Sequence, residues 1–259
     1  MNKQNLNTEK LNNSENEKFP VDCLVSVPIY NKHGIEIYNG DCRTTITALH
    51  PTVVITDPPY NVGYNYDVHI DKMDDWEYIE LLQTFERCPA VFIHYPEEMI
   101  KYVCASMGVP LEVVTWIYNA NTPKQHRMIA WFNCKPDFSK IKQPYKNLSD
   151  KRILELIKNG SEGTDIYDWW NVEQVKNVSK EKTAHPCQIP EEIYRRIILT
   201  TTTEDDIILD PFMGSGTCLK VARDLGRKAV GIELSSYYCK LAIDRLNQTE
   251  TLFMANEAH

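Results

Sequence analysis

Residues 51–60 read PTVVITDPPY, and this stretch decides how the rest of the chain is interpreted. Residues 53–56 are apolar or β-branched, as expected of a strand in a parallel sheet that is covered on both faces. The strand runs directly into an aspartate, two prolines and a tyrosine. Each proline has a fixed φ and restricts the residue before it, so the corner is stiff. We predict that this corner holds the Asp57 carboxylate and the Tyr60 ring in place for a ligand.

Outside this corner the chain alternates between predicted strands and predicted helices. The predicted strands are 34–41, 51–57, 90–96, 111–119, 128–136, 206–210 and 228–234, and the predicted helices are 74–88, 97–108, 151–159, 190–202, 217–226 and 236–246. Repeated β-α units predict an α/β fold with a mostly parallel sheet and right-handed crossovers. The turn-prone stretch at 120–127 predicts that the two strands around it form an antiparallel hairpin. In the helix at 74–88, the spacing places Trp76, Ile79 and Leu82 on one side.

The chain has 259 residues, enough for one large α/β domain or for one domain with a smaller insertion. Residues 1–19 are polar and are predicted to form a disordered tail, whereas 20–259 form the folded domain. From 137 to 182 the periodicity weakens, and lysines mix with the aromatic cluster YDWW at 167–170. We predict that 137–182 is an inserted segment that reads the substrate. A solvated, lysine-rich loop region is the alternative.

Composition narrows the classes of function. The net charge of −8 argues against a protein that grips nucleic acid over its whole surface, although it permits local basic patches. None of the eight cysteines forms a C-x-x-C pair, so we expect no zinc ribbon, redox motif or other metal site. No apolar run approaches the roughly 20 residues of a membrane span, and the first residues lack the apolar core of a signal peptide. We therefore expect a cytoplasmic protein without a membrane partner.

A second motif lies in residues 207–222, IILDPFMGSGTCLKVA, between a predicted strand and a predicted helix. Gly214 and Gly216 permit a tight turn and a close approach to a ligand. The P-loop pattern is absent, and Leu219 stands where the third glycine of a dinucleotide fingerprint belongs. Glu233 ends the next strand about 20 residues later, where nucleoside-binding folds place an acceptor for the ribose hydroxyls. These features predict a nucleoside site without a pyrophosphate cradle, which fits S-adenosylmethionine; a structural turn followed by a surface glutamate is the alternative.

Taken together, the two motifs resemble those of the DNA amino-methyltransferases, which methylate the exocyclic amine of adenine or cytosine. DPPY at 57–60 matches the catalytic tetrapeptide of this family, and FMGSG at 212–216 matches its cofactor loop. TAHPCQIPEEI at 183–193 and NGDC at 39–42 are similar to two further family segments. The resemblance covers residues 35–247 and implies a Rossmann-like methyltransferase fold. Because DPPY precedes the cofactor loop, it also implies the permuted, β-type order, with target recognition by 137–182.

Residue roles follow from this resemblance. It implies catalysis by Asp57, Pro58, Pro59 and Tyr60, and cofactor binding by Asp41, Cys42, Asp57, His185, Pro186, Asp210, Phe212, Gly214, Ser215, Gly216, Thr217 and Glu233. Asp41 and Cys42 would contact the adenine edge of the cofactor, Glu233 its ribose, and His185 with Pro186 its methionine end. For His185, a packing or loop-orienting role is favoured over a catalytic one. Phe132, Trp169 and Trp170 are candidates for stacking on bases, with burial in the core as the alternative.

The function that the resemblance implies is transfer of a methyl group from S-adenosylmethionine to N6 of a flipped-out adenine in double-stranded DNA. The Asp57 carboxylate and the Pro58 carbonyl would accept the two amine hydrogens, and Tyr60 would stack on the base. N4 of cytosine is the alternative target. An RNA amine methyltransferase or a catalytically silent DNA-binding subunit is a more distant alternative. A homodimer and a cognate restriction endonuclease are the partners that the resemblance adds.

Overall fold

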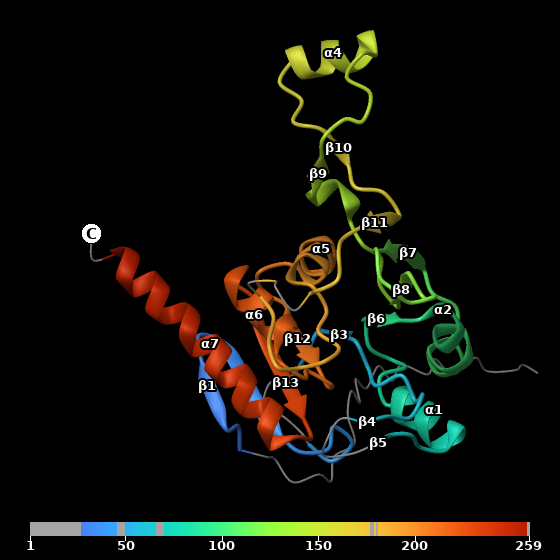
Figure 1. Ribbon diagram of the computed structural model, residues 1–259, viewed down its shortest axis with the longest axis vertical. Coiled ribbons are helices and arrows are strands. Elements are labelled where there is room, and N and C mark those ends of the chain that lie inside the picture. The colour runs from blue at the N-terminus through green and yellow to red at the C-terminus, as the bar shows by residue number, and fades with distance from the viewer. Residues whose placement is uncertain (1–26, 46–49, 66–69, 177–178, 180, 258–259) are drawn as a thin grey trace, which may run out of the picture.

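The fold is centred on one nine-stranded sheet, seen edge-on in the computed structural model (Figure 1). The structure describes residues 27–45, 50–65, 70–176, 179 and 181–257, so the predicted tail at 1–19 lies outside it. The strands of the large sheet are β1 (Tyr30–Lys32), β2 (Ile35–Asn39), β3 (Val53–Thr56), β6 (Ala90–His94), β7 (Glu112–Ile117), β8 (His126–Phe132), β11 (Trp169–Asn171), β12 (Ile207–Asp210) and β13 (Lys228–Glu233). Two small ladders pair β4 (Tyr64–Asn65) with β5 (Ile70–Asp71), and β9 (Lys142–Gln143) with β10 (Thr164–Asp165).

The strand order is β1-β2-β13-β12-β3-β6-β8-β7-β11. Strands β2, β13, β12, β3 and β6 run parallel to one another, whereas β8 runs antiparallel to both β6 and β7. The structure therefore confirms the mostly parallel sheet and the antiparallel hairpin. It adds two strands that the sequence did not predict, one at each edge of the sheet: β1 pairs antiparallel with β2, and β11 pairs in parallel with β7.

Helices cover the sheet on both faces, which explains why its central strands are apolar throughout. Val53 and Ile55 of β3 belong to the core cluster that includes α5 (Glu191–Thr201), α6 (Thr217–Asp224) and part of α7 (Ser236–Glu257). Val54, between them, packs on the opposite face with α1 (Asp75–Gln83) and with the helix made of α2 (Pro96–Glu98), the π-helical turn η1 (Met99–Val103) and α3 (Cys104–Met107). Alternate side chains of one strand thus enter two separate cores.

The predicted apolar side of the first helix is wrong in one residue. Helix α1 forms as predicted, with the Asp74 side chain accepting a hydrogen bond from the Trp76 backbone N–H as its N-cap. Its buried side consists of Tyr78, Leu81 and Leu82, whereas the Trp76 side chain is 74% exposed. Trp76 lies in the first turn, beyond the edge of the sheet core, so helical spacing alone did not determine its burial.

An arm made of β9, helix α4 (Lys151–Lys158) and β10 projects from the sheet (Figure 1). It lies within the predicted insertion, which begins with the short 3-10 helix η2 (Phe138–Lys140) and returns to the body at β11. Of the three aromatic candidates for base stacking, Phe132 and Trp170 are buried in the core, as the alternative reading held. Trp169 is 43% exposed, and Lys146 lies 4.5 Å above its ring.

The sheet topology brings several chain segments to one edge. The carboxyl ends of β2, β3, β6, β12 and β13 share this edge because the strands are parallel. Strand β8 runs the other way, so its amino end lies at the same edge, where Met128 pairs with His94. Among the described residues, no helix is long and apolar enough to cross a membrane.

Candidate active site

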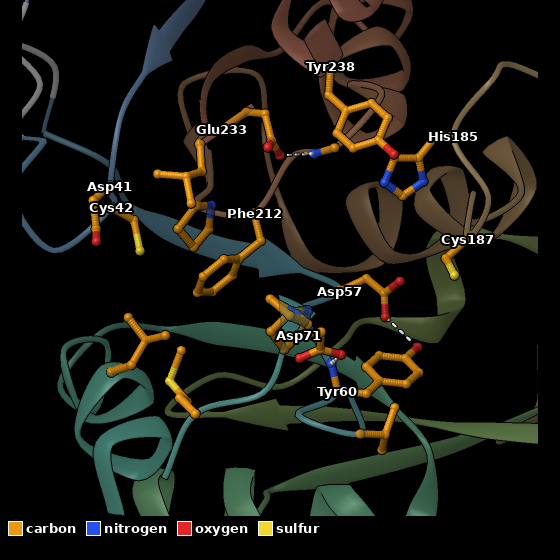
Figure 2. Close-up of a pocket in the computed structure, with 18 of the residues that line it drawn as sticks. Asp41, Cys42, Asp57, Tyr60, Asp71, His185, Cys187, Phe212, Glu233 and Tyr238 are labelled. Carbon is orange, nitrogen blue, oxygen red and sulfur yellow. Dashed lines mark hydrogen bonds between the residues drawn. The ribbon is translucent and has the colours of Figure 1, made fainter. Parts of the chain in front are cut away.

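A cavity of roughly 400 Å³ opens at this edge of the sheet, within the size range of small-molecule sites. It is lined by Gly40, Asp41, Cys42, Arg43, Asp57, Pro58, Pro59, Tyr60, Val62, Asp71, Met73, Leu81, Tyr95, Arg127, His185, Cys187, Pro211, Phe212, Gly214, Glu233, Leu234 and Tyr238. Figure 2 shows Asp41 and Cys42 on one side of Phe212, and Asp57 with Tyr60 on the other. Both sequence motifs therefore meet in one cavity, although about 150 residues separate them in the chain.

The Asp57–Tyr60 corner is internally hydrogen-bonded. The Tyr60 hydroxyl donates to Asp57 Oδ1 at 2.5 Å, and the Tyr78 hydroxyl donates to the Pro59 carbonyl oxygen. The Tyr60 ring stacks on the His94 ring with a centroid distance of 4.2 Å and an interplanar angle of 27°. Since His94 occupies one face of the Tyr60 ring, a ligand base would stack on the other face.

A buried carboxylate holds the turn that follows this corner. Asp71 Oδ2 accepts a hydrogen bond from the Tyr60 backbone N–H at 2.9 Å, and Oδ1 accepts one from the Asn61 N–H at 2.7 Å. Asn61 has a φ of 58°, a left-handed conformation that asparagine adopts more readily than most residues. The Asn61 side-chain oxygen then accepts from the Met73 N–H at 2.8 Å. Asp71, which lies on β5 about ten residues downstream, thereby fixes the position of Tyr60. Asn61 ties the same turn to Met73.

Arg127 reaches the same corner from the amino end of β8. Its Nη1 lies 3.6 Å from Asp57 Oδ2, and both side chains are largely buried. The guanidinium also lies 5.3 Å from the Tyr60 ring centroid, 5.2 Å from that of Tyr95 and 5.3 Å from that of Trp116. Three aromatic rings and one carboxylate therefore surround the positive charge.

Burial tunes the carboxylates around the cavity. Desolvation raises the pKa of Asp57 to about 6, even though Arg127 and the Tyr60 hydroxyl both favour its ionised form. Burial likewise raises the pKa of Glu233 and raises that of Asp210 to about 7. For His94, burial lowers the pKa to about 3, so its ring stacks on Tyr60 in the neutral form. Asp57 is consequently an acceptor-only carboxylate at neutral pH.

The glycine loop is shaped by close packing. Gly214 and Gly216 have φ values of 51° and 70°, which favour glycine. A Cβ atom on Gly214 would lie 3.0 Å from His185 Nε2, and one on Gly216 would lie 2.8 Å from the Ala242 Cβ. The loop therefore lies directly against the His185 segment, and the loop-orienting role of this histidine stays a prediction.

Glu233 binds the same loop through its carboxylate. Its Oε2 accepts a hydrogen bond from the Gly214 N–H at 3.1 Å, and its Oε1 accepts one from the Ser235 N–H at 2.7 Å. Each oxygen retains a second lone pair for a ligand hydroxyl. Asp41, on the neighbouring strand end, is held by Arg43, whose hydrogen bonds lower the pKa of the Asp41 carboxylate. This part of the cavity offers acceptors to ribose and amino groups, and the Phe212 ring offers an apolar face, so it fits an adenosine-containing cofactor such as S-adenosylmethionine.

The structure places the remaining predicted residues behind the cavity wall. The Asp210 carboxylate accepts hydrogen bonds from the Thr56 hydroxyl at 2.8 Å and the Phe212 N–H at 3.3 Å, and so joins the ends of two strands. The Thr217 hydroxyl accepts one from Arg245 at 2.8 Å. Pro186, Ser215 and Gly216 do not line the cavity, while their neighbours His185, Cys187 and Gly214 do. These residues position the loop, and their direct contact with the cofactor stays a prediction.

Several residues that line the cavity were missed by reasoning from the sequence, and Asp71, Tyr95 and Arg127 are the ones that contact the Asp57–Tyr60 corner. Tyr95 lies near the end of the strand predicted at 90–96, so the rule that sites lie at carboxyl ends of parallel strands would have found it. Arg127 lies at the start of a strand, and only the position of β8 beside β6 brings it to the cavity. Asp71 follows a stretch without clear periodicity, and no sequence signal indicated it.

Curated relatives are similar to the chain over most of its length. The type II methyltransferase M2.DpnII of Streptococcus pneumoniae is 30% identical, and the match covers 86% of this chain and 93% of the relative. The DNA adenine methyltransferase YhdJ of Escherichia coli is 28% identical, with 82% of each chain covered. The type II methyltransferase M.HpaI of Haemophilus parainfluenzae is 29% identical over 80% of this chain and 73% of the relative.

Solved structures share the fold. The PvuII DNA methyltransferase, described as cytosine-N4-specific, has a TM-score of 0.60 at 16% identity, covering 83% of this chain and 87% of the other. The complex of M1.HpyAVI with its SAM ligand has a TM-score of 0.55 at 22% identity, covering 82% of this chain and 99% of the other. The family described as DNA methylase matches residues 52–244, which include both the Asp57 corner and the glycine loop. By this match, by the curated relatives and by its fold, the chain belongs to the N6/N4 DNA methylase family.

Proposed function

We propose that this protein transfers a methyl group from S-adenosylmethionine to N6 of an adenine in DNA. One observation carries the proposal: the Asp57–Tyr60 corner and the Gly214–Glu233 pair line a single cavity, so a base and a cofactor can meet there. One of the similar relatives supports the substrate, since YhdJ is named a DNA adenine methyltransferase.

The chemistry required of the protein is positioning. When bound, S-adenosylmethionine supplies an electrophilic methyl group, and the exocyclic amine is a poor nucleophile because its lone pair is delocalised into the ring. Asp57 accepts one amine hydrogen, and the Pro58 carbonyl accepts the other, which directs the lone pair toward the methyl group. Tyr60, backed by His94, provides the surface on which the flipped base stacks. Preorganisation of these groups supplies the rate enhancement.

The proton released by methylation has a defined acceptor. As the new N–C bond forms, the amine becomes more acidic, and the Asp57 carboxylate takes the proton that it already holds by a hydrogen bond. With a pKa of about 6, Asp57 then loses that proton to water at neutral pH. Asp57 thus accepts the hydrogen bond from the amine, then takes the proton, and finally returns to its ionised state.

The proposal is tested at Asp57. Asp57→Asn replaces one acceptor oxygen by a donor of the same size, and we expect methyl transfer to fall by at least about 100-fold. Binding of S-adenosylmethionine, measured by calorimetry, should change by less than about threefold, because Asp57 lies across Phe212 from Asp41 and Cys42 (Figure 2). A matched control is Asp206→Asn, whose carboxylate bonds to Thr52 and Thr203 outside the cavity. Full activity in Asp57→Asn would overturn the mechanism.

The target base is identified in the same assay. DNA that carries the transferred labelled methyl group is digested to nucleosides and separated by chromatography. Label in N6-methyladenine supports the proposal, and label only in N4-methylcytosine replaces adenine by cytosine. Single-molecule sequencing of DNA from cells that express the protein then gives the sequence context. A cognate restriction endonuclease, the partner expected from the resemblance, would have to leave that DNA uncut, and cleavage of the methylated DNA would contradict this partner.

We propose further that the arm from β9 to β10 contacts the DNA and reads its sequence. Basic side chains are frequent in and beside it, namely Lys140, Lys142, Lys146, Lys151, Arg152 and Lys158. On this acidic chain, whose net charge is −8, such a local concentration favours phosphate contacts. The exposed Trp169 ring beneath Lys146 adds a surface for stacking.

A further inference from the structure

Arg127 has an unusual environment for a charged side chain. It is only 6% exposed, and its Nε and Nη1 make no hydrogen bond of normal geometry with any of the described residues, although the Tyr118 hydroxyl interacts with the guanidinium. The closest carboxylate oxygen, Asp57 Oδ2, is 3.6 Å from Nη1, beyond a normal hydrogen bond. A guanidinium cannot lose its charge in a protein, and buried donors without partners cost stability. A buried guanidinium whose Nη1 lacks a hydrogen bond of normal geometry therefore lines the cavity in which the base is proposed to bind.

The geometry of Asp57 and Arg127 defines a recognition surface. Asp57 Oδ2 is a hydrogen-bond acceptor, and Arg127 Nη1 is a donor 3.6 Å away from it. Adenine carries the complementary pair on its Watson–Crick edge, where the N6 amine donates and the neighbouring N1 accepts. Cytosine has the same pair in its N4 amine and N3. Guanine differs on its Watson–Crick edge, because the ring nitrogen there that adjoins the amine, N1, carries a hydrogen, which would face the guanidinium donor.

We propose that Arg127 is a specificity-determining residue that donates a hydrogen bond to the ring nitrogen next to the amine being methylated. Asp57 accepts a hydrogen bond from the amine, and Arg127 donates one to the ring nitrogen beside it. The pair therefore selects bases whose Watson–Crick edge places an amine next to an unprotonated ring nitrogen. The inference rests on the proposed function, since it concerns the base that enters the same cavity. Guanine is rejected because two donors would meet without an acceptor between them.

The test uses a substrate that lacks only the acceptor. Duplex DNA with the target sequence is made with adenine or with 1-deazaadenine at the target position, in which a C–H replaces N1 and the amine remains. Single-turnover transfer of labelled methyl is measured for the wild type and for Arg127→Met at pH 8, where Asp57 is ionised in the wild type. The ratio of the rates on the two bases cancels their different intrinsic reactivity when the two enzymes are compared. If the modified base is cytosine, 3-deazacytosine is used in the same way.

We expect the wild-type preference for adenine over 1-deazaadenine to exceed that of Arg127→Met by about 10- to 100-fold, as for a hydrogen bond to a charged group. Transfer to 1-deazaadenine as fast as to adenine in the wild type, after correction for the intrinsic methylation rates of the two free nucleosides, overturns the proposal, whether or not the variant folds. Equal ratios in the wild type and the variant also overturn it. If Arg127 only kept Asp57 ionised, Arg127→Met would shift the acidic limb of the pH–rate profile upward and leave the ratio unchanged. Absence of transfer to any base by the wild type would instead refute the proposed function.

Discussion

At the scale of single residues, the site depends on a carboxylate that is buried yet ionised. Asp57 has to lose its proton to accept an amine hydrogen, but burial raises its pKa from 3.8 to about 6. Arg127 and the Tyr60 hydroxyl oppose this rise, which keeps Asp57 an acceptor at the pH of the cell. Tyr60 stacks on His94, whose ring is neutral at the pH of the cell because burial lowers its pKa to about 3. The histidine beside Asp57 therefore does not gain or lose charge near neutral pH.

The pH dependence of the reaction follows from this pKa. Below about pH 6 Asp57 is protonated in the free enzyme, so we expect kcat/KM to fall with decreasing pH, tenfold for each pH unit. The effect on stability has the opposite sign: because the pKa is raised on folding, stability from this group is present below 3.8 and lost as pH rises through about 6. Asp57→Asn should therefore gain stability relative to the wild type between pH 4 and 7. Chemical denaturation at pH 4 and at pH 7 gives the free energy of unfolding of both proteins. If the difference between variant and wild type were the same at the two pH values, the buried-acid interpretation would be contradicted.

At the scale of elements, the glycine loop and the end of β13 form one unit. The Glu233 carboxylate joins the Gly214 and Ser235 backbone N–H groups, so the loop and the strand end are held together before any ligand binds. On the other side of the loop, the His185 ring lies against Gly214 and within 4.7 Å of the Tyr238 ring centroid. Cofactor binding is therefore sensitive to small displacements of this loop.

Gly214→Ala tests this packing, with Gly226→Ala as its matched control. Both glycines have positive φ, 51° and 71°, so each substitution should destabilise the fold by about 1–2 kcal/mol. Only at Gly214 would the new Cβ come within 3.0 Å of His185, because nothing lies within 4 Å of that position at Gly226. We expect the affinity for S-adenosylmethionine to fall by about tenfold or more in Gly214→Ala and to stay unchanged in Gly226→Ala. Equal affinities in both variants, measured by calorimetry, would show that the loop tolerates displacement.

At the scale of the whole molecule, the catalytic body and the arm are connected by two short strands. Gln143 of β9 pairs with Thr164 of β10, so the residues between them form one continuous excursion from the sheet. Helix α4 has no buried residue and contributes nothing to either core cluster. Its role therefore has to lie in contacts with another molecule or in holding the arm in shape.

Replacing residues 144–163 by Asn-Gly tests whether the arm binds DNA while the body alone binds the cofactor. The dipeptide favours the tight turn that would close the paired ends of β9 and β10. We expect the variant to keep its thermal stability and its affinity for S-adenosylmethionine, but to lose most of its DNA affinity and a large part of the salt dependence of binding. Lys151→Glu/Arg152→Glu in the intact arm is the control for charge alone. Unchanged DNA affinity after the replacement would mean that the body alone binds the DNA.

Local sequence patterns determined a large part of this molecule. The apolar run before Asp57 indicated a strand buried on both faces, and the structure places its alternate residues in two cores. The antiparallel hairpin, the helix at α4 and the helix after the glycine loop form where their spacing predicted them. Resemblance in the DPPY and FMGSG motifs indicated the family that the comparisons confirm. These features are local because each depends on residues that are neighbours in the chain.

Only the tertiary structure decided the rest. Trp76 is exposed although its spacing matched the apolar side of its helix, because burial depends on what lies opposite the helix. The short strand β11 forms because β7 offers it an edge, and its own three residues carry little signal. Arg127 enters the site because β8 runs against β6 and begins at the edge where the parallel strands end. The sequence by itself determined the strand, the stiff corner and the acceptor Asp57, whereas strand order decided which charge lies beside that acceptor, since non-local pairing leaves no periodic trace in the chain.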